Sequence, residues 1–514
     1  MRRYLVSGND ISSQKKKYDI VIVGAGLAGL YCALNISPSF SCAIITKGKI
    51  DSGSSWLAQG GIAAVTKEDD SFENHIFDTL TAGAGHCDRQ AVRTLVEEGP
   101  EDIRKMIEYG VPFDKDENGE IKVTREGGHS CRRILHCGGD ATGKLMTQRL
   151  AEVVSEKENI DVIFDTSLVD VLTNENGAVG IVVNNGSENY IIESANIVIA
   201  SGSIGQLYRY TTNPKGSNGE GVAACMRAGA KTRDMEFVQF HPTALAAHEK
   251  DGRMFLVSEA VRGEGGILKN SSDEPFMYNK HSLRDLAPRD IVTREILKEL
   301  DRTDTDTAYL DVSCMDEEFF SKRFPTIYEY CKECGINVPH DKIPVRPTQH
   351  YHMGGIETDL DARTNIEGLY ACGECACTGV QGANRLASNS TLECLVFGRR
   401  AANYINTHFR KNEKISPDLE SDSKNLVACP EMGEIEEDIM LMKKTMSKYV
   451  GPVRKKEGLE KALCVFNEMK EKYEKCVLSS QTAFTAYAAA CVSAHITEKA
   501  LCRKESIGSH YIVK

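Results

Sequence analysis

The chain has 514 residues, of which 41% are hydrophobic and 26% charged, and its formal net charge is −12. This length exceeds what one compact core accommodates, so we expect two to four domains of ordinary globular composition; a fibrous or disordered chain is excluded. The acidic balance disfavours nucleic acid as a partner, because phosphate binding needs a concentrated basic face.

The N-terminal segment carries Arg2, Arg3, Lys15, Lys16 and Lys17 but no apolar stretch long enough for a signal peptide, and we expect it to be a solvated tail. Near the other end of the chain, residues 481–496 are weakly polar and too few to span a bilayer, which indicates a packed helix of small residues. The sequence therefore predicts a cytoplasmic protein with no membrane partner.

An apolar segment, 18–23, runs directly into the pattern G-x-G-x-x-G and then into a helical pattern. In such a pattern Gly24 permits a tight turn, Gly26 lets the backbone approach a pyrophosphate, and Gly29 allows close packing of the helix on the sheet. A helix that begins near Leu27 adds amide donors and a positive dipole end. The combination predicts a dinucleotide site that includes Gly24, Ala25, Gly26, Leu27, Ala28 and Gly29.

The second predicted strand, 41–45, ends in Thr46 and Lys47. In NAD-binding proteins an acidic residue at this point binds the ribose 2′-hydroxyl, and none is present here. The ribose has to be held in another way, and this difference favours a flavin dinucleotide over NAD.

The chain contains eighteen cysteines, which we expect to be free thiols in a reducing compartment. Cys331 and Cys334 have no second pair, and Cys372, Cys375 and Cys377 crowd a glycine-rich loop. Neither group has the paired spacing of a zinc or iron–sulfur site, so the sequence predicts no metal.

The remaining pattern divides the chain into parts. Strand-like segments with turns at 174–177 and 184–186 predict a β-meander that returns to the parallel sheet near 199. Polar turns and short helices indicate an inserted domain, and charged helical segments after a linker beyond Lys411 indicate a helical domain. We therefore predict an α/β protein in which a Rossmann-like FAD-binding domain (1–234 and 352–415) carries an inserted α+β capping domain (235–351) and a C-terminal helical domain (425–514).

Five short segments far apart in the chain combine glycine with cationic or titratable side chains; they are 124–129, 239–243, 287–290, 350–355 and 382–390. Taken singly, an Arg before Asp at a helix start is typical of a surface ion pair. A lone His is usually a structural histidine whose hydrogen bonds are satisfied. Arg binds carboxylates through two parallel hydrogen bonds and His can donate to them. Two arginines and two histidines that meet in one pocket would therefore suit a dicarboxylate.

Together with the N-terminal fingerprint, these segments resemble the succinate dehydrogenase/fumarate reductase flavoprotein family over nearly the whole chain. The segment 124–136 is similar to the form of this loop in the aspartate oxidase branch of the family. The resemblance implies that FAD contacts the fingerprint and also Lys47, Ser54, Ser55, Trp56, Leu57, Ala58, Gln59, Gly60, Gly61, Glu220, Glu374, Ser390 and Thr391.

The resemblance also implies the roles of residues at the substrate. The side chains that would hold substrate carboxylates are His241, Thr243, His350 and Arg385. Arg289 would be the catalytic residue that transfers the proton. Glu126 would orient the substrate and contact its amino group, because a desolvated ammonium needs a carboxylate partner. A plain surface position for Glu126 stays open as the alternative.

Many relatives attach FAD covalently through a His in the loop that ends in Gly60 and Gly61, and this chain has Ser54 at that place, so the resemblance implies non-covalent FAD. The implied reaction is oxidation of L-aspartate to iminoaspartate, with electrons passing to dioxygen or fumarate. It would begin NAD biosynthesis through quinolinate, with a quinolinate synthase as a partner.

Two alternatives remain at this point. A fumarate reductase or succinate dehydrogenase flavoprotein subunit would need an iron–sulfur partner. A flavoprotein that serves as an RNA-binding or scaffolding module would share the fingerprint, but it would not need His241, Arg289, His350 and Arg385.

Overall fold

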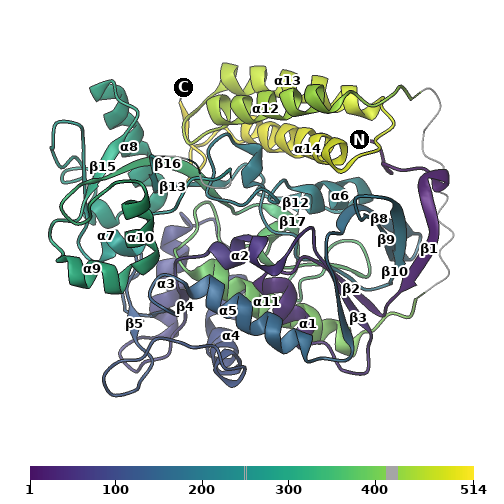
Figure 1. Cartoon of the computed structure of the whole chain (residues 1–514), viewed down its shortest axis with the longest axis horizontal. Helices are drawn as coiled ribbons and strands as arrows, with labels where there is room; N and C mark the ends of the chain where they lie inside the picture. The colour runs from purple at the N-terminus through teal and green to yellow at the C-terminus, as the bar shows by residue number, and fades with distance from the viewer. Residues whose placement is uncertain (248, 250–251, 413–425, 514) are drawn as a thin grey trace.

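The computed structural model describes residues 1–247, 249, 252–412 and 426–513. The end of the predicted FAD-binding domain at 415 and most of the predicted linker lie outside these described residues. Figure 1 shows a sheet-containing body, a part with helices α7 to α10 on one side of it, and three long helices along one edge.

A five-stranded parallel sheet carries the fingerprint at the end of its middle strand, and its strand order is β18-β11-β2-β3-β7. The strands are β2 (Ile20–Val23), β3 (Cys42–Ile45), β7 (Ile160–Ile163), β11 (Ile197–Ile199) and β18 (Leu369–Ala371). Strands buried on both faces need continuous apolar residues, and β2 and β3 consist of buried side chains throughout. Helix α1 (Leu27–Leu34) follows β2 directly and packs on α11 (Asn389–Thr407). The predicted α/β architecture is confirmed.

The predicted β-meander is also confirmed. It consists of β8 (Ser167–Asn174), β9 (Gly177–Asn184) and β10 (Asn189–Glu193), which pair antiparallel before the chain enters β11. At the first turn Gly177 has a φ of +123°, which favours glycine.

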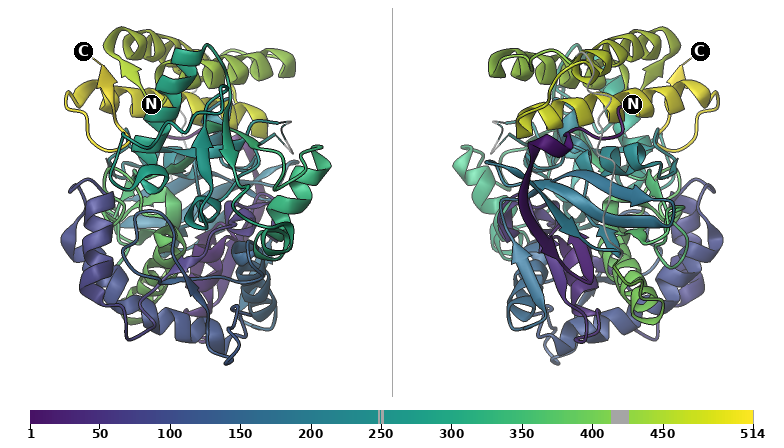
Figure 2. Two further views of the ribbon diagram at one scale, coloured as in Figure 1. Left: turned by 90° about the vertical axis from the view of Figure 1, so that its left-hand side faces the viewer. Right: turned by 90° about the vertical axis from the view of Figure 1, so that its right-hand side faces the viewer.

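The N-terminal segment is ordered, and the expectation of a solvated tail is wrong. Strand β1 (Ile11–Lys17) pairs parallel with β10, and the right-hand view of Figure 2 shows it beside the meander. Leu5 and Val6 are buried, and Leu5 N donates to Asp170 Oδ2 at 2.8 Å. Arg2 Nη1 donates to Cys476 O at 2.8 Å. Two apolar residues and a few hydrogen bonds to distant segments fix this end, and nothing in the local sequence indicates those partners.

The inserted part has its own antiparallel sheet and its own apolar core. The strand order is β13-β16-β15-β14, with β13 (Val238–Leu245), β14 (Ile267–Lys269), β15 (Ala308–Asp311) and β16 (Ile343–His352). Its helices are α7 (Glu259–Gly263), α8 (Arg289–Thr303), α9 (Glu317–Arg323) and α10 (Pro325–Glu333). Strands β13 and β16 run side by side from the body of the molecule, with Val238 opposite His352. Because they join the two parts, residues on them face the junction.

Shorter elements complete the body. The small sheets contain β4 (Ile62–Ala63), β5 (Val123–Thr124), β6 (Ile134–Leu135), β12 (Thr232–Arg233), β17 (Gly355–Glu357) and β19 (Ala376–Cys377). The helices are α2 (Ser54–Leu57), α3 (Phe72–Ala82), α4 (Arg89–Glu108), α5 (Thr142–Ser155) and α6 (Glu220–Ala228).

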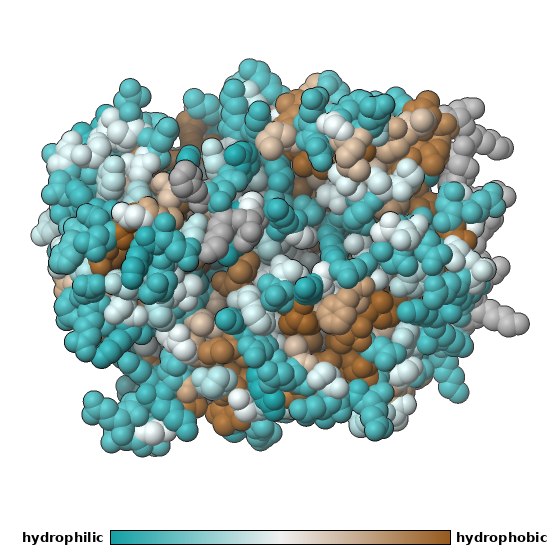
Figure 3. All heavy atoms as spheres, viewed as in Figure 1, coloured by the Kyte–Doolittle hydropathy of each residue, from teal (hydrophilic) through white to brown (hydrophobic). Residues whose placement is uncertain are grey.

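The C-terminal part is helical, with α12 (Met432–Tyr449), α13 (Lys456–Glu474), α14 (Gln481–Cys502) and the short strand pair β20 (Arg454–Lys455) and β21 (Ile512–Val513). Helix α14 is lined with buried alanines, which confirms the predicted small-residue helix. On the face seen in Figure 3 the inserted part is mostly hydrophilic, whereas apolar residues gather on the bundle. None of the helices in the described residues combines the length and apolar character needed to cross a membrane.

All eighteen cysteines are free thiols. Within the described ranges, no group of three or more His, Cys, Asp or Glu side chains is arranged to hold a metal ion.

Candidate functional site

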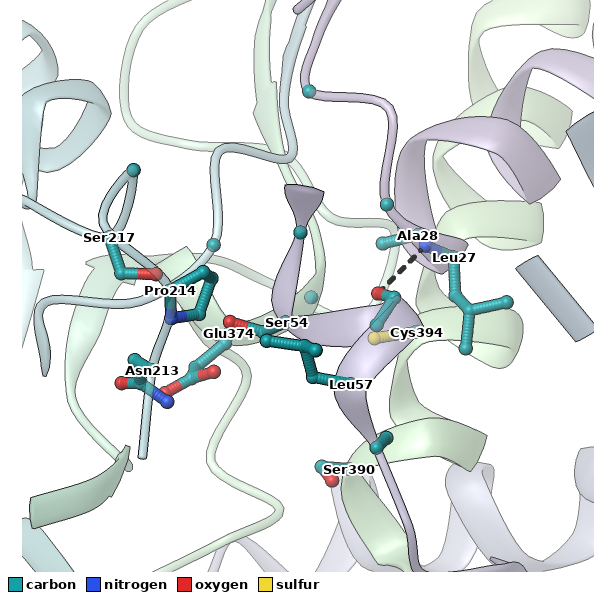
Figure 4. A pocket seen from close by; sticks show the side chains of 18 of the residues that line it. Leu27, Ala28, Ser54, Leu57, Asn213, Pro214, Ser217, Glu374, Ser390 and Cys394 are labelled. Carbon is teal, nitrogen blue, oxygen red and sulfur yellow. Dashed lines mark hydrogen bonds between the residues drawn. The ribbon is translucent and has the colours of Figure 1, made fainter. Parts of the chain in front are cut away.

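One large cavity extends from the carboxyl end of β2 to the junction with the inserted part. Its walls include most of the predicted site residues: Gly24, Ala25, Gly26, Leu27, Ala28, Lys47, Ser54, Ser55, Leu57, Ala58, Gln59, Gly60, Gly61, Glu126, Glu220, His241, Arg289, His350, Glu374, Arg385, Ser390 and Thr391. Figure 4 shows how α1, α2, the loop around Pro214 and the start of α11 surround one end of it. Segments far apart in sequence thus share one wall.

Two glycines of the fingerprint are required by close backbone contacts. A Cβ on Gly24 would lie 2.2 Å from Ala200 O, and the φ of Gly24 is +119°. A Cβ on Gly29 would lie 1.9 Å from Gly24 O. Gly29 therefore serves the packing of α1 on the sheet, as predicted, and it does not line the cavity.

Helix α1 begins at Leu27 and points its N-terminus at the cavity. Its N-cap residue, Gly26, supplies no side-chain cap, and Leu27 N donates to Ser55 Oγ at 3.0 Å, the dashed line in Figure 4. A helix N-terminus of this kind favours phosphate, because its amide groups and dipole meet negative charge. Trp56, in contrast, does not line the cavity, and Lys144 Nζ lies 5.9 Å from the centroid of its ring.

A carboxylate lies beside the end of the second parallel strand, although the strand itself provides none. Lys47, just after β3, forms an ion pair with Glu220 at the start of α6. Glu220 Oε1 also accepts hydrogen bonds from Gln481 Nε2 at 3.0 Å and from the Thr485 hydroxyl. A carboxylate from another segment, held by α14, therefore lies beside the end of β3.

Glu374 and the start of α11 form the middle of the cavity. Glu374 Oε1 accepts from Ser203 Oγ at 2.5 Å and from His352 N at 3.0 Å, and burial raises the pKa of Glu374 to about 7. Ser390 and Thr391 lie in the first turn of α11, so a second helix N-terminus meets the same space. An elongated cavity with two helix N-termini and side-chain-free glycines fits a dinucleotide such as FAD.

At the other end, two neutral histidines and an arginine face the cavity. The rings of His241 on β13 and His350 on β16 have centroids 5.1 Å apart. Arg385 Nη2 lies 3.1 Å from His350 Nε2. Burial, reinforced by nearby guanidinium groups, holds the pKa of both histidines well below its ordinary value. Burial also lowers the pKa of Arg385 to about 10, which leaves its guanidinium charged at neutral pH.

Three buried polar atoms at this end of the cavity have no hydrogen-bond partner: Glu126 Oε1, His241 Nε2 and Arg385 Nε. A buried polar atom without a partner costs roughly 1–3 kcal/mol. Because the three atoms come from distant segments and face one cavity, the arrangement is typical of a site that a polar, charged ligand completes.

Arg289, the first residue of α8, is held by two side chains. Its Nε donates to Glu259 Oε2 at 2.6 Å and its Nη1 donates to Gln239 Oε1 at 2.9 Å. Arg262 Nη2 lies 3.6 Å from the other oxygen of Glu259. Burial acts to raise the pKa of Glu259, but the two guanidinium groups outweigh it and lower the pKa. An ionised carboxylate therefore lies between two arginines.

Glu126 is 4% exposed, so the surface alternative is wrong. Its Oε2 accepts a hydrogen bond from Ser388 Oγ at 2.6 Å. Burial raises the pKa of Glu126, and the Ser388 hydrogen bond opposes that rise. The loop that carries Glu126 is anchored by Arg133, which forms buried ion pairs with Asp70 and Asp78. Glu126 is thus fixed with one free oxygen toward the cavity.

Thr243 is the predicted substrate residue that the structure does not bring to the cavity wall. Its hydroxyl donates to Val257 O at 2.9 Å, and its N donates to His241 Nδ1 at 3.2 Å. Thr243 therefore lies behind His241 and orients that ring.

Sequence reasoning missed Gln239 as a contact of Arg289, and it missed Glu259 and Arg262 altogether. The segment 258–266 carries the signal that could have found the latter two, since it combines acidic, basic and glycine residues as the five chosen segments do.

Comparisons with known proteins agree with this geometry. A family model described as FAD binding domain matches residues 19–391, and one described as the C-terminal part of fumarate reductase flavoproteins matches residues 440–512. An L-aspartate oxidase of Streptomyces coelicolor is 45% identical over 392 residues, which cover 75% of this chain and 67% of that protein. L-aspartate oxidase 2 of Ralstonia nicotianae is 39% identical over 507 residues, which cover 96% and 90%.

Among solved structures, an E. coli quinol fumarate reductase matches with a TM-score of 0.89 and 30% identity over 98% of this chain and 92% of that chain. The FAD binding model covers more than half of the chain, and the match to the Ralstonia protein spans nearly all of both proteins. The chain therefore belongs to the succinate dehydrogenase/fumarate reductase flavoprotein family, in its L-aspartate oxidase branch.

Proposed function

We propose that this protein is an FAD-dependent enzyme that oxidises L-aspartate to iminoaspartate. The observation that carries the proposal is the free oxygen of Glu126, buried in the same cavity as the two histidines and Arg385. A dicarboxylate clamp alone suits aspartate, succinate and fumarate equally, because all three carry two carboxylates. A buried carboxylate beside that clamp favours the substrate with an ammonium group.

The clamp binds the two carboxylates and orients the substrate. Arg385 supplies a charged guanidinium, and neutral His241, whose Nδ1 accepts from Thr243 N, donates its Nε2–H. His350 Nε2 accepts from Arg385 Nη2, so His350 orients that guanidinium. Fixing both ends of the substrate places its Cα–H in one orientation, and positioning of this kind contributes up to roughly 7–11 kcal/mol where the geometry is ideal.

Arg289 is the proton-transferring residue in this proposal: as the hydride leaves Cα, its guanidinium takes the proton that the substrate ammonium loses and gives one of its own to Glu259. Its guanidinium lines the cavity while Glu259 and Gln239 hold it from behind, so its position is fixed before substrate binds. Glu259, ionised between Arg289 and Arg262, is placed to exchange a proton with Arg289 away from the substrate. These residues form a line that leads from the cavity into the inserted part.

FAD, when bound, supplies the hydride acceptor. The residues that would hold it are the fingerprint, Lys47, the loop 54–61, Glu220, Glu374 and the start of α11. We propose that it binds non-covalently, because Ser54 on the cavity wall offers no imidazole for a flavin–protein bond. Acid precipitation tests this: the yellow colour is expected in the supernatant, and colour in the pellet would show a covalent bond.

Electrons pass on to dioxygen or to fumarate, and the product feeds quinolinate and NAD biosynthesis with a quinolinate synthase as partner. A cytoplasmic location belongs to the same proposal.

One experiment decides between the proposed substrate and succinate. The purified yellow protein is mixed with L-aspartate or with succinate in the absence of oxygen, and flavin absorbance is followed. We expect L-aspartate to bleach the flavin rapidly and succinate to do so slowly or not at all. Bleaching by succinate alone would instead assign the chain to succinate or fumarate chemistry.

A further inference from the structure

A tight turn near the C-terminus lies between two segments of the substrate end. Ile507 N donates to His510 O at 2.8 Å and His510 N donates back to Ile507 O at 3.0 Å, which closes a turn with Gly508 and Ser509 at its corner. Gly508 has a φ of +52°, in the left-handed region. No residue of the turn lines the cavity, so any effect on the substrate has to pass through other residues.

On one side, the turn holds the loop that carries Arg385. Ser509 N and Ser509 Oγ each donate to Ala383 O at 2.9 Å. A Cβ on Gly508 would lie 2.4 Å from Ala383 O, so glycine is needed for this approach. Ala383 N in turn donates to Gly83 O at 3.1 Å. The backbone two residues before Arg385 is therefore fixed on both sides.

On the other side, the turn holds helix α8, whose first residue is Arg289. Gly508 O accepts a hydrogen bond from Arg294 Nη1 at 3.0 Å, and Arg294 Nη2 donates to Asp290 Oδ2 at 2.9 Å. The guanidinium of Arg294 also lies 5.1 Å from the centroid of the Tyr511 ring. One turn therefore contacts the loop of the carboxylate clamp and the helix of the proton-handling residue.

The helical bundle fixes the turn itself. Fully buried Arg454 donates from Nη1 to His510 Nδ1 and to Glu236 O, both at 2.8 Å. His510 Nε2 lies 3.0 Å from Arg503 O. Burial, with the nearby arginines, lowers the pKa of His510 to about 3, so the ring is a neutral acceptor at Nδ1 and donor at Nε2. The bundle thus sets the position of the turn.

We propose that the turn 507–510 is a positioning element of the dicarboxylate site, with Ser509 as its main positioning residue. It sets the separation between Arg385 and Arg289 through Ala383 and Arg294. The inference rests on the proposed function, because it assumes that this cavity binds dicarboxylates. It adds that the C-terminal bundle takes part in substrate affinity without touching the substrate.

The test uses the full-length, FAD-loaded protein with Ser509→Ala, Ser509→Thr and a matched control, Ser506→Ala. Ser506 lies in the same segment, and among the residues that the structure describes its hydroxyl bonds only to the backbone of Ile512. The probe is malonate, a dicarboxylate whose single carbon between the carboxylates cannot be dehydrogenated. Its Kd is measured by flavin absorbance titration, together with KM and kcat for L-aspartate.

We expect Ser509→Ala to raise the Kd of malonate and the KM of L-aspartate by a similar factor, roughly 3- to 10-fold, because one of two hydrogen bonds to Ala383 O is lost. The kcat should change less than twofold. Ser509→Thr, which keeps the hydroxyl, should restore wild-type binding, and Ser506→Ala should bind malonate as the wild type does. FAD content should stay the same in all three.

Several outcomes would overturn the inference. If wild type and Ser509→Ala bind malonate equally, or if Ser509→Ala only lowers Tm, the turn has no positioning role. If Ser509→Ala does not fold, Arg294→Met tests the other contact of the turn, and unchanged malonate binding there counts against the proposal. Failure of the wild type to bind malonate would instead refute the proposed dicarboxylate site, and so distinguishes the two.

Discussion

The two ends of the cavity are built on different principles. The cofactor end is made largely of backbone: glycines, loop 54–61 and the N-termini of α1 and α11 surround it. The substrate end is made of charged and titratable side chains, each from a different segment. They are His241 on β13, His350 on β16, Arg289 on α8, Arg385 in the loop before α11 and Glu126 in the loop between β5 and β6. The cofactor end thus combines one contiguous glycine motif with several distant segments, whereas the substrate end consists of side chains that each come from a separate segment.

The difference has an energetic side. At the cofactor end a substitution meets backbone at close range, so the damage is steric and extends to folding. At the substrate end buried side chains have unpaired atoms, so a substitution there acts electrostatically and mainly affects ligand binding and turnover. Four substitutions test whether the two ends separate in this way.

The largest effect is expected for Arg289→Leu. Turnover should fall by roughly 10²- to 10⁴-fold, the range for loss of a group that transfers a proton in the transition state. Because Arg289 belongs to the substrate end, FAD content should change little, whereas Tm should fall, since buried Glu259 loses its hydrogen-bonded partner and retains only Arg262 at 3.6 Å. Arg302→Leu, an exposed position on the same helix, is the control. Steady-state kinetics at matched flavin content measure the effect, and turnover near the wild-type rate would remove Arg289 from the mechanism.

Gly29→Ala tests the cofactor end. The new Cβ would lie 1.9 Å from Gly24 O, so α1 has to shift relative to the strand before it. We expect purified protein with little bound FAD and a free energy of unfolding lower by roughly 1–3 kcal/mol or more, as for overpacked sites. Gly433→Ala is the control, because nothing lies within 4 Å of its Cβ position. Full FAD content in Gly29→Ala would contradict the steric account.

Glu126→Gln divides the substrates within the substrate end. Loss of a charged partner for the ammonium should lower kcat/KM for L-aspartate roughly 10- to 100-fold, while fumarate reduction survives because fumarate carries no amino group. Glu120→Gln, in the preceding exposed loop, is the control. Both reactions are measured on one preparation. Equal losses in the two would mean that Glu126 supports the site in general and does not select aspartate.

The smallest effect concerns pH and Ser388→Ala. Burial raises the pKa of Glu126 and the Ser388 hydrogen bond lowers it, so removal of the hydroxyl raises that pKa further. Aspartate binding needs the ionised carboxylate, which is present above the pKa and lost as pH falls through it. The acid limb of kcat/KM for L-aspartate should therefore move to higher pH, with a loss of roughly 2- to 10-fold near the limb.

Other charges near Glu126, namely Glu259, Arg289 and Arg323, remain in the Ser388→Ala variant. Their effect on the pKa of Glu126 is therefore the same in the wild type and in the variant. Fumarate reduction should keep its pH profile, and Ser321→Ala, at a half-buried serine on α9, should change neither profile. A parallel shift of both reactions would point to a general change in the site.

The sequence by itself determined the local features of this protein. The strand, glycines and helix start from 18 to 29 occur within one run of residues, and their pattern depends on short-range sterics and period, so both the parallel sheet and the nucleotide end could be predicted. The meander and α14 followed from turn residues and composition in the same way. Motif resemblance added the family, and with it the residues of the clamp.

Only the tertiary structure decided which distant groups meet. Glu220 pairs with Lys47 at the end of β3, Glu259 and Gln239 hold Arg289, and Thr243 lies behind His241 and away from the cavity. The order of the N-terminal segment and the contacts of the turn at Ser509 depend on partners more than a hundred residues away. Local pattern carries no information on such contacts, because they are fixed by how separately formed layers pack and by which buried polar groups that packing leaves to be satisfied.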